Sequence, residues 1–478
     1  MSFNSFIFWL VFPFIFLVYW IIPKKFCKAQ NLFLLIVSYL LYMNWKPSFA
    51  LILLGVTSIC YGGGIIINKQ DTGKRKLIVC WCFVLLGLLP LLIFKYYNFL
   101  NESITSVLTS TGLHFMLPGL NWAIPVGISF YTFQAVGYLM DVYHKRIPAE
   151  IDFLEFALFV SFFPQVMSGP ISTAKDLMPQ IKQSRSFKYE QAKAGLQVLL
   201  WGMFLKVVIA DRLGDFVDTV YGHYDYYTSM TCVKASLAYT VQIYCDFAGY
   251  SFMAVGIAKM LGFNLINNFE RPYFAASVTE FWKRWHISLT RWLTTHVYIN
   301  LGGNRCSIIR QYFNVLITFM VSGLWHGANW TFVLWGVFHG FFQIIEKALM
   351  GDRLKRELKE KNIRLTSIRC VRILITFCLV SFAWIFFRMP TIGEAFDIII
   401  RMFSNADGRV ADPMYSYVVY TAILGLLGSE FIKEYWPSRF TLIKDKYSVI
   451  RWTAYLFLFA GVILYGVLDS SSFIYVSF

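Results

Sequence analysis

Apolar runs of about eighteen or more residues recur along the whole chain. An apolar helix of that length spans the hydrocarbon core of a bilayer, so the runs predict an all-α protein that crosses the membrane many times. The composition agrees, because 57% of the 478 residues are hydrophobic and only 15% are charged. No Ser/Gly linker and no long polar block separates the runs, which predicts a single membrane-embedded domain over residues 1–478.

The net charge of +16 at pH 7 bears on topology and on partners. In membrane proteins, Lys and Arg collect in cytoplasmic loops and attract anionic headgroups, so membrane lipid is an expected partner. The sequence contains no nucleic-acid-binding module, and we expect no nucleic-acid partner. The nine cysteines are scattered, and Cys80 and Cys82 lack the two-residue gap of a metal or redox pair. We interpret them as buried small apolar residues.

Basic residues, taken loop by loop, predict the orientation of the chain. Two segments break the alternation: 153–168 is predicted to be re-entrant, and 312–345 is predicted to be a hairpin bent near Gly323 to Asn329. The first run is aromatic and no small-residue cleavage site follows it, so we interpret it as a retained helix. About ten full spans result, with both termini outside the cytoplasm. These spans are 3–22, 31–43, 49–67, 77–94, 123–140, 194–210, 233–262, 373–387, 417–432 and 452–468.

His326 lies inside the apolar hairpin, between glycines at positions 323 and 327. An ionisable side chain at membrane depth is a functional-site hypothesis by default. The glycines would let the helix break there, which a membrane tolerates only where protein or a water-filled cavity surrounds the break. A histidine facing an internal cavity and a histidine bonded to a neighbouring helix explain the residue equally well.

His286 lies in a second stretch of interest, residues 280–289. Trp282, Trp285 and Leu289 share one helical face, which is typical of an amphipathic helix at the membrane interface with basic side chains on another face. That interpretation explains the tryptophans and the cations but not His286. Taken alone, a histidine in this setting is more often structural than catalytic.

The types of residue present limit the chemistry. The sequence has no His-Glu-x-x-His zinc signature, no Gly-x-Ser-x-Gly elbow and no phosphate loop. General base catalysis by a neutral imidazole remains, and it suits the removal of a proton from a hydroxyl. A hydroxyl that attacks a thioester needs such a base, a dry cavity and donors for the developing oxyanion.

Several motifs resemble the membrane-bound O-acyltransferases, and within them the alginate O-acetyltransferase branch. The resemblance covers nearly the whole chain, and the two histidine motifs together are highly specific. The matching stretches are 125–132, 169–171, 244–251, 268–273, 280–289, 301–305, 322–331 and 334–336.

The resemblance implies a many-helix fold around a tunnel between the two membrane faces. It matches His326 to the family's catalytic histidine and His286 to its second active-site position. It also implies an acetyl group passed from a cytoplasmic thioester donor, acetyl-CoA or an acyl carrier protein, to hydroxyls of an extracellular or periplasmic polysaccharide. A second, extracytoplasmic acetyltransferase would complete the transfer, in a bacterial inner membrane. No bound cofactor and no metal are expected.

The chain departs from that branch at a few positions. Phe252 stands where a polar residue is common, and Asn300 stands where proline is common. Residues 294–296, Thr-Thr-His, replace a stretch that commonly carries Arg-Asp-Tyr. These departures leave donor handling and the substrate open.

Five further residues are candidates for substrate binding: Trp285, Trp325, Asn329, Asp246 and Arg305. Asp246 is predicted to be buried, where it could pair with an arginine or orient a histidine. Asn329 could donate a hydrogen bond in the tunnel or cap the second half of the hairpin. Of the other histidines, we expect His339 to make a structural hydrogen bond, His296 to be interfacial, and the three in loops to be solvated: His114, His144 and His223.

We therefore interpret the chain as a membrane O-acyltransferase, most simply an O-acetyltransferase for an extracellular polysaccharide. A first alternative is transfer of D-alanine from a carrier protein to teichoic acid. A second is a polysaccharide flippase or export component, which the missing internal repeats argue against. A third is a degenerate membrane scaffold, which the intact histidine pair argues against.

Overall fold

The computed structural model describes residues 3–71, 73–113, 117–167, 169–357 and 365–467, and within those ranges it is helical, with one isolated bridge between Tyr227 and Arg409. The predicted all-α class is confirmed. Contacts divide the chain into two compact units, each described by itself: residues 1–197 with 254–266, and residues 198–253 with 267–478. This division does not test the single domain predicted over 1–478, which stays a prediction. His114 lies outside the described residues.

The first unit is built around α6, which is buried over almost its whole length. Its neighbours α3 and α4 pack on it and on each other. The predicted re-entrant segment is a short apolar pair, α7 and α8, broken at Phe162 before Pro164. The helices of this unit are α1 (Phe6–Ile21), η1 (Lys24–Phe26), α2 (Cys27–Met43), α3 (Pro47–Lys69), α4 (Lys74–Leu91), η2 (Leu92–Tyr96), α5 (Tyr97–Ser110), α6 (Ile128–Tyr143), α7 (Phe153–Ser161), α8 (Phe163–Val166), α9 (Ala174–Lys182) and the greater part of α10 (Tyr189–Met203).

The second unit carries both motif histidines. Its long helix α12 is mostly buried and ends in residues that belong to the first unit. The helices are η3 (Phe204–Ala210), α11 (Asp211–Gly222), η4 (Tyr224–Tyr226), α12 (Ser229–Met260), η5 (Pro272–Phe274), α13 (Val278–Arg284), α14 (Ile287–Leu293), η6 (Thr294–Tyr298), α15 (Ile308–His326), α16 (Trp330–Glu357), α17 (Ser367–Arg388), α18 (Ile392–Phe403), α19 (Ser416–Tyr435), α20 (Pro437–Lys446) and α21 (Ser448–Tyr465).

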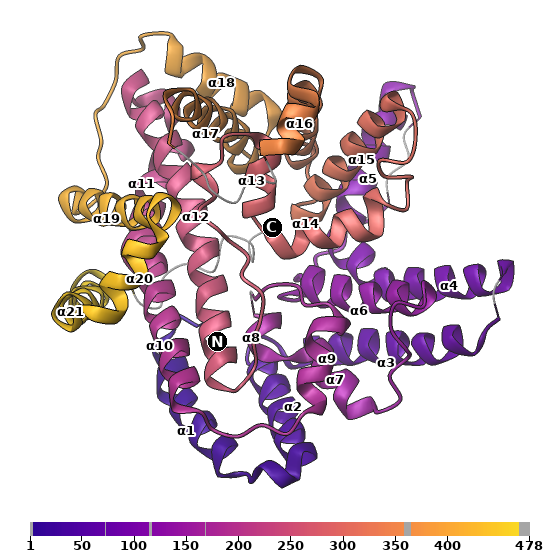
Figure 1. The fold of residues 1–478 in the computed structure, drawn as a ribbon. Helices are drawn as coiled ribbons and strands as arrows, with labels where there is room; N and C mark the ends of the chain where they lie inside the picture. The colour runs from indigo at the N-terminus through magenta and orange to yellow at the C-terminus, as the bar shows by residue number, and fades with distance from the viewer. Residues whose placement is uncertain (1–2, 72, 114–116, 168, 358–364, 468–478) are drawn as a thin grey trace. The chain divides into compact units, whose positions relative to one another are not determined.

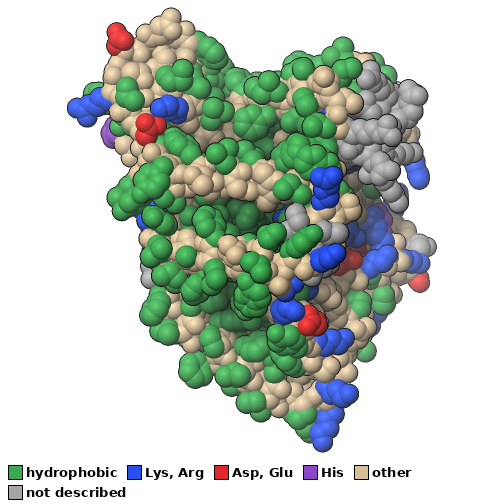
Figure 2. Space-filling view, turned by 60° about the vertical axis from the view of Figure 1, so that its left-hand side comes forward, with side chains coloured by type: hydrophobic (Ala, Val, Ile, Leu, Met, Phe, Trp, Pro, Cys, Tyr) green, Lys and Arg blue, Asp and Glu red, His purple; other side chains and the backbone are tan. Residues whose placement is uncertain are grey.

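Long apolar helices make the chain a multi-pass membrane protein. Within the described ranges, eight helical segments are long and apolar enough to cross a bilayer. The helices α1, α6 and α19, at the predicted spans 3–22, 123–140 and 417–432, are not among the eight. Exposed hydrophobic side chains dominate the face shown in Figure 2, as lipid contact requires. The exact number of spans and the orientation of the termini stay predictions.

The predicted hairpin is confirmed as α15 and α16, which lie side by side (Figure 1). Helix α15 ends at His326 and α16 begins at Trp330, so the bend lies where the glycines and Asn329 predict it. The two helices approach so closely that a Cβ atom on Gly323 would lie 2.2 Å from the carbonyl oxygen of Phe332. A Cβ on Gly336 would lie equally close, at 2.2 Å, to the carbonyl oxygen of Phe319. Small residues at such crossings are how membrane helices pack tightly.

Asp246 is buried on α12, as predicted, and it pairs with a lysine. The ammonium group of Lys206 donates to Asp246 and lies 2.6 Å from the carboxylate of Asp211. Lys206 belongs to the π-helical segment η3, and all three side chains are at most 4% exposed. The backbones come close enough for this pairing because Gly202 and Gly249 face each other without side chains. The triad therefore joins η3 and α11 to α12.

Candidate active site

His326 is the last residue of α15 and is 2% exposed. Its ring centroid lies 5.0 Å from that of Trp335 and 5.3 Å from that of Phe387. A Cβ on the following residue, Gly327, would lie 2.1 Å from the ring of Phe332, so the glycine lets the bend fold back tightly. The imidazole is thus enclosed by aromatic rings from α16 and α17.

His286 lies in the turn between α13 and α14, and its side chain is fully buried. The residue has a left-handed backbone, with φ of 43°, which is uncommon outside glycine. The turn is held by Asn268, whose carbonyl accepts from the N–H of Ile287 at 3.0 Å. The side-chain oxygen of Asn268 accepts from the N–H of Ser288 at 3.1 Å. This local geometry turns the imidazole inward, away from the interfacial setting that the amphipathic pattern predicts.

The structure brings the two histidines together. Their ring centroids lie 6.3 Å apart, although forty residues of chain separate them. The ring of Trp325 lies beside both, with its centroid 5.6 Å from that of His286 and 4.9 Å from that of His326. The ring of Phe247 on α12 lies 4.7 Å from that of His286. Burial lowers the pKa of His286 from 6.5 to about 3, so its imidazole is neutral near pH 7. A neutral imidazole can accept a proton or a hydrogen bond.

The other predicted site residues lie in different surroundings. Trp285 packs within the aromatic core, against Phe281 and Trp384. Asn329 caps α16, because its side-chain oxygen accepts from the N–H of Thr331 at 3.0 Å. Its side-chain amide donates to the carbonyl of Pro390 at 2.8 Å, which ties the bend to the end of α17.

The structure also locates Arg305 and three of the remaining histidines. Arg305 is exposed, in the loop that follows Gly303. His339 makes the structural hydrogen bond that was predicted, accepting from the indole N–H of Trp282 at 3.2 Å. His144 and His223 are exposed, as expected for loop residues.

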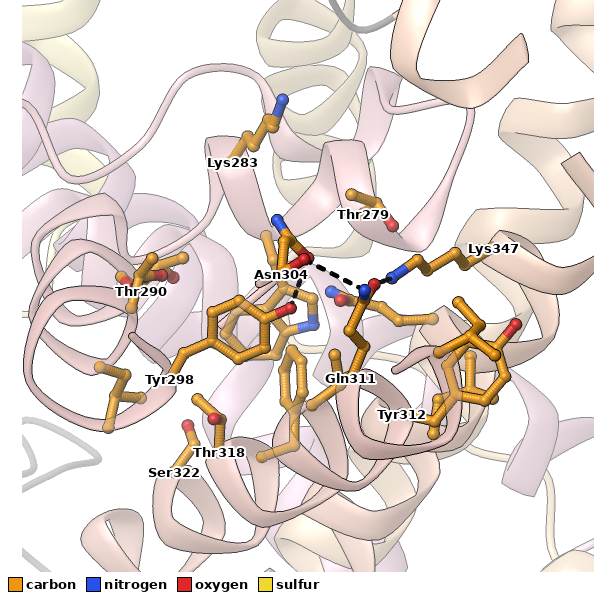
Figure 3. A pocket seen from close by; sticks show the side chains of 18 of the residues that line it. Thr279, Lys283, Thr290, Tyr298, Asn304, Gln311, Tyr312, Thr318, Ser322 and Lys347 are labelled. Atoms are coloured by element: carbon orange, nitrogen blue, oxygen red, sulfur yellow. Dashed lines mark hydrogen bonds between the residues drawn. The ribbon is translucent and has the colours of Figure 1, made fainter. Parts of the chain in front are cut away.

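A pocket of about 700 Å³ opens between α13, α14, α15 and α16. Lys283 and Lys347 lie toward one end of it, and Thr318 and Ser322 lie toward the other (Figure 3). Ser322 is 1% exposed and its hydroxyl has no hydrogen-bond partner among the described residues. Ser322 is one helical turn before His326, so it links the lining of the pocket to His326 along α15.

A chain of hydrogen bonds lines the basic end of the pocket (Figure 3). Lys347 donates to Gln311 at 2.6 Å, and Gln311 donates to the carbonyl of Asn304 at 3.2 Å. The side chain of Asn304 accepts from Tyr298 at 2.7 Å. The sequence did not predict this group of residues, although Asn304 lies in the matching stretch 301–305. Across the described ranges, no cluster of three His, Cys, Asp or Glu side chains could hold a metal ion.

A multi-pass helical protein with a buried histidine pair beside an elongated pocket fits a membrane-embedded transferase. The chain belongs to the membrane-bound O-acyltransferase family, whose model matches residues 142–388. It is 37% identical to the probable alginate O-acetylase AlgI of Azotobacter vinelandii, over 86% of this chain and 80% of that protein. It is 33% identical to the peptidoglycan O-acetyltransferase of Helicobacter pylori, over 78% of this chain and 73% of that protein. The chain is therefore a membrane O-acyltransferase.

A more distant relative transfers a different group. The teichoic acid D-alanyltransferase of Bacillus subtilis is 24% identical to this chain, over 76% of this chain and 91% of that protein. The relatives therefore include proteins named for acetyl transfer and proteins named for aminoacyl transfer.

Proposed function

We propose that this enzyme moves an acetyl group from a cytoplasmic thioester donor to hydroxyls of an extracellular or periplasmic polysaccharide. The observation that carries the proposal is the pair of buried imidazoles with ring centroids 6.3 Å apart. The relatives named as O-acetylases and O-acetyltransferases favour acetyl as the group, and at least 33% identity links them to this chain.

In the proposed reaction, His326 is the general base. Its imidazole takes the proton of the attacking hydroxyl as the oxygen–carbon bond forms at the thioester carbonyl. The carbon–sulfur bond then breaks, and the departing thiolate takes up the proton that the His326 imidazolium holds, which returns His326 to its neutral form. His286, which is neutral, orients or polarises the acyl group. Backbone N–H groups near Gly327 would stabilise the oxyanion.

The pocket is the proposed donor site. Acetyl-CoA and a carrier-bound phosphopantetheine both present phosphate groups at one end and a thioester at the other. Lys283 and Lys347 suit the phosphates, and Ser322 lies toward the end nearer to His326. Trp325, in contact with both histidines, would pack on the acyl group.

The other predicted binding residues receive indirect roles in this proposal. Trp285 and Asn329 support the site through the core contacts and the cap described above. Asp246 precedes Phe247, the ring that contacts His286, so its bond to Lys206 would hold that ring in place. Arg305, which is exposed beside the pocket residue Asn304, would attract an anionic donor.

The proposal extends to location and partners. We place the enzyme in a bacterial inner membrane with both termini outside the cytoplasm. An extracytoplasmic acetyltransferase would complete the transfer to the polysaccharide, and an acyl carrier protein is an alternative donor.

D-alanyl transfer to teichoic acid is the second candidate, favoured by the similarity to the Bacillus subtilis enzyme over 91% of that protein.

The test is the ester acetate content of the surface polysaccharide in cells that carry wild-type protein, His326→Ala or the exposed-histidine control His223→Ala. Membrane expression is matched between the three strains. Loss of acetate in His326→Ala alone, with polymer export unchanged, supports the proposal. Full acetate in His326→Ala contradicts the role of His326. Loss of ester-linked D-alanine instead supports the second candidate, and loss of export supports a transport function.

A further inference from the structure

Arg271 and Arg284, near the turn of His286, both bind the buried carboxylate of Glu434 on α19. Glu434 lies in the last turn of α19, and its side chain is 1% exposed. One of its oxygens accepts from Arg271 Nε at 2.7 Å, and the other accepts from Arg284 at 2.8 Å. Each carboxylate oxygen of Glu434 therefore binds a different arginine.

The two arginines belong to chain segments that pair directly around His286. The N–H of Glu270 donates to the carbonyl of Arg284 at 2.9 Å. On the other side of His286, the N–H of Ile287 donates to the carbonyl of Asn268 at 3.0 Å. The guanidinium of Arg284 also donates to the carbonyl of Arg271, at 3.4 Å. Residues 268–271 thus hold the turn in place from one side.

This arrangement contains two strained residues. Arg271 has φ of 49° and His286 has φ of 43°, both in the left-handed region. Such conformations in residues other than glycine persist only where the surrounding structure enforces them. Glu434 binds Arg271 directly, and it binds Arg284, two residues before His286. It therefore restrains the backbone at both strained residues.

A second carboxylate holds Arg284 but not Arg271. Glu280 lies 2.6 Å from Arg284 and also accepts from Arg369 of α17, at 3.0 Å, and from the N–H of Ala276, at 2.8 Å. If Glu434 were removed, Arg284 would keep an ionic partner, so α13 would stay docked. The restraint on residues 268–271 would weaken instead. The expected defect is therefore a displaced turn in a folded protein.

We propose that Glu434 is a positioning residue for acyl transfer, which fixes the left-handed turn of His286 and so sets this imidazole against His326. The inference rests on the proposed function, in which His286 acts on the acyl group. The residues that line the pocket do not include Glu434, so it affects the site through His286 and not through donor contact.

The experiment compares Glu434→Gln, Glu434→Asp and the control Asp141→Asn in membrane vesicles of the native cells, which retain the extracytoplasmic partner and are supplied with acetyl-CoA and polysaccharide. Asp141 forms an ion pair with Arg146 at 2.9 Å in the other compact unit, and its side chain is 10% exposed. Initial rates of acetyl ester formation are measured at limiting and at saturating acetyl-CoA. The amount of folded protein is matched by detergent size-exclusion chromatography.

We expect Glu434→Gln to lower the saturating rate by about 10- to 100-fold, because a misplaced group near the chemistry costs about that much. The KM for acetyl-CoA should change by less than about twofold, because the pocket keeps its lining. Glu434→Asp, which keeps the carboxylate, should recover part of the rate, and Asp141→Asn should keep nearly all of it. A wild-type rate in Glu434→Gln, a loss confined to KM, or an equal loss in Asp141→Asn would overturn the inference.

His286→Ala in the same assay distinguishes a failure of the positioning role of Glu434 from a failure of the proposed function. If His286→Ala is inactive and Glu434→Gln is active, the positioning role fails while the proposed function stands. If His286→Ala is fully active, the proposed role of His286 fails, and the positioning role fails with it. If wild-type vesicles form no acetyl ester, the proposed acetyl transfer from acetyl-CoA itself fails.

Discussion

Ser322 lies one helical turn before His326 on α15, so a residue that lines the pocket and His326 share one helix face. The hydroxyl of Ser322 is buried and has no partner among the described residues. A buried polar group without a partner is uncommon and calls for an explanation. A bound donor would supply the missing hydrogen bond.

We therefore expect Ser322→Ala to weaken donor use without destabilising the enzyme. A lost hydrogen bond of about 1–1.5 kcal/mol corresponds to a rise of roughly 5- to 12-fold in the KM for acetyl-CoA. The thermal midpoint should stay close to that of the wild type, because the hydroxyl makes no hydrogen bond to any of the described residues. Steady-state kinetics in vesicles measures the first effect, and an unchanged KM would contradict the donor contact.

The lysines at the basic end of the pocket should recognise phosphate. Replacing both Lys283 and Lys347 by alanine should raise the KM for acetyl-CoA by about tenfold or more, because charge-assisted hydrogen bonds contribute about 1.5–3 kcal/mol each. The KM for acetyl-N-acetylcysteamine, a thioester without phosphates, should not change. Lys193→Ala is the control, because that lysine is an exposed residue paired with Glu190 at 3.1 Å. Equal effects on both donors would argue against a phosphate role.

The buried His286 gives the stability of the protein a defined pH dependence. Its pKa is about 3 in the folded chain, because burial lowers it, against 6.5 for an ordinary histidine. As pH falls below about 6.5, His286 becomes protonated in the unfolded chain but stays neutral in the folded chain. The free energy of unfolding therefore falls. The fall continues until pH approaches 3. Thermal midpoints in detergent between pH 7 and pH 5 should therefore decline less steeply in His286→Gln than in the wild type.

The same shift predicts the activity profile. His286 should stay neutral between pH 5 and pH 8, because both values lie well above its pKa of about 3. Any acid limb of the rate in that range must come from another group. Wild type and His286→Gln, if the latter keeps residual activity, should share the midpoint of that limb.

The hairpin tolerates no side chain at its crossing point. In Gly323→Ala the new Cβ would lie 2.2 Å from the carbonyl oxygen of Phe332, and backbone cannot move aside as a flexible side chain can. We expect a loss of at least about 1–3 kcal/mol of stability, with less folded protein on size-exclusion chromatography. Gly425→Ala on α19 is the matched control, because nothing lies within 4 Å of its Cβ position. That control should be neutral or stabilise by up to about 1 kcal/mol.

The buried triad predicts an unequal cost for its members. Lys206→Met would leave Asp211 and Asp246 buried without their shared cation, a change that typically costs about 3–5 kcal/mol. Asp246→Asn should cost less, because Lys206 keeps its bond to Asp211 at 2.6 Å. The yield of folded protein from detergent extracts measures both, and a smaller loss for Lys206→Met would contradict the shared-cation arrangement.

Several features of the fold could be predicted from the sequence because they depend on residues near in the chain. The lengths of the apolar runs place α2 and α3 within about four residues of their observed bounds. Glycines around His326 predict the bend, since they act on the adjacent backbone. A cap on α16 was one of the two roles that the sequence leaves open for Asn329, and the structure shows that cap. The motifs of residues 244–336 suffice to indicate the family, to which the chain belongs.

The tertiary structure decided which distant side chains meet. The sequence leaves the partner of Asp246 open between an arginine and a histidine, and the fold supplies Lys206 from a π-helical turn forty residues earlier. The pocket takes its lining from α13 to α16, so no single motif could define it. Glu434, about 150 residues after His286, meets the two arginines around that turn only through the packing of α19. Hydropathy and caps act locally along the chain, whereas ion pairs and pockets depend on how helices pack, which is why the first were determined by the sequence alone and the second only by the folded structure.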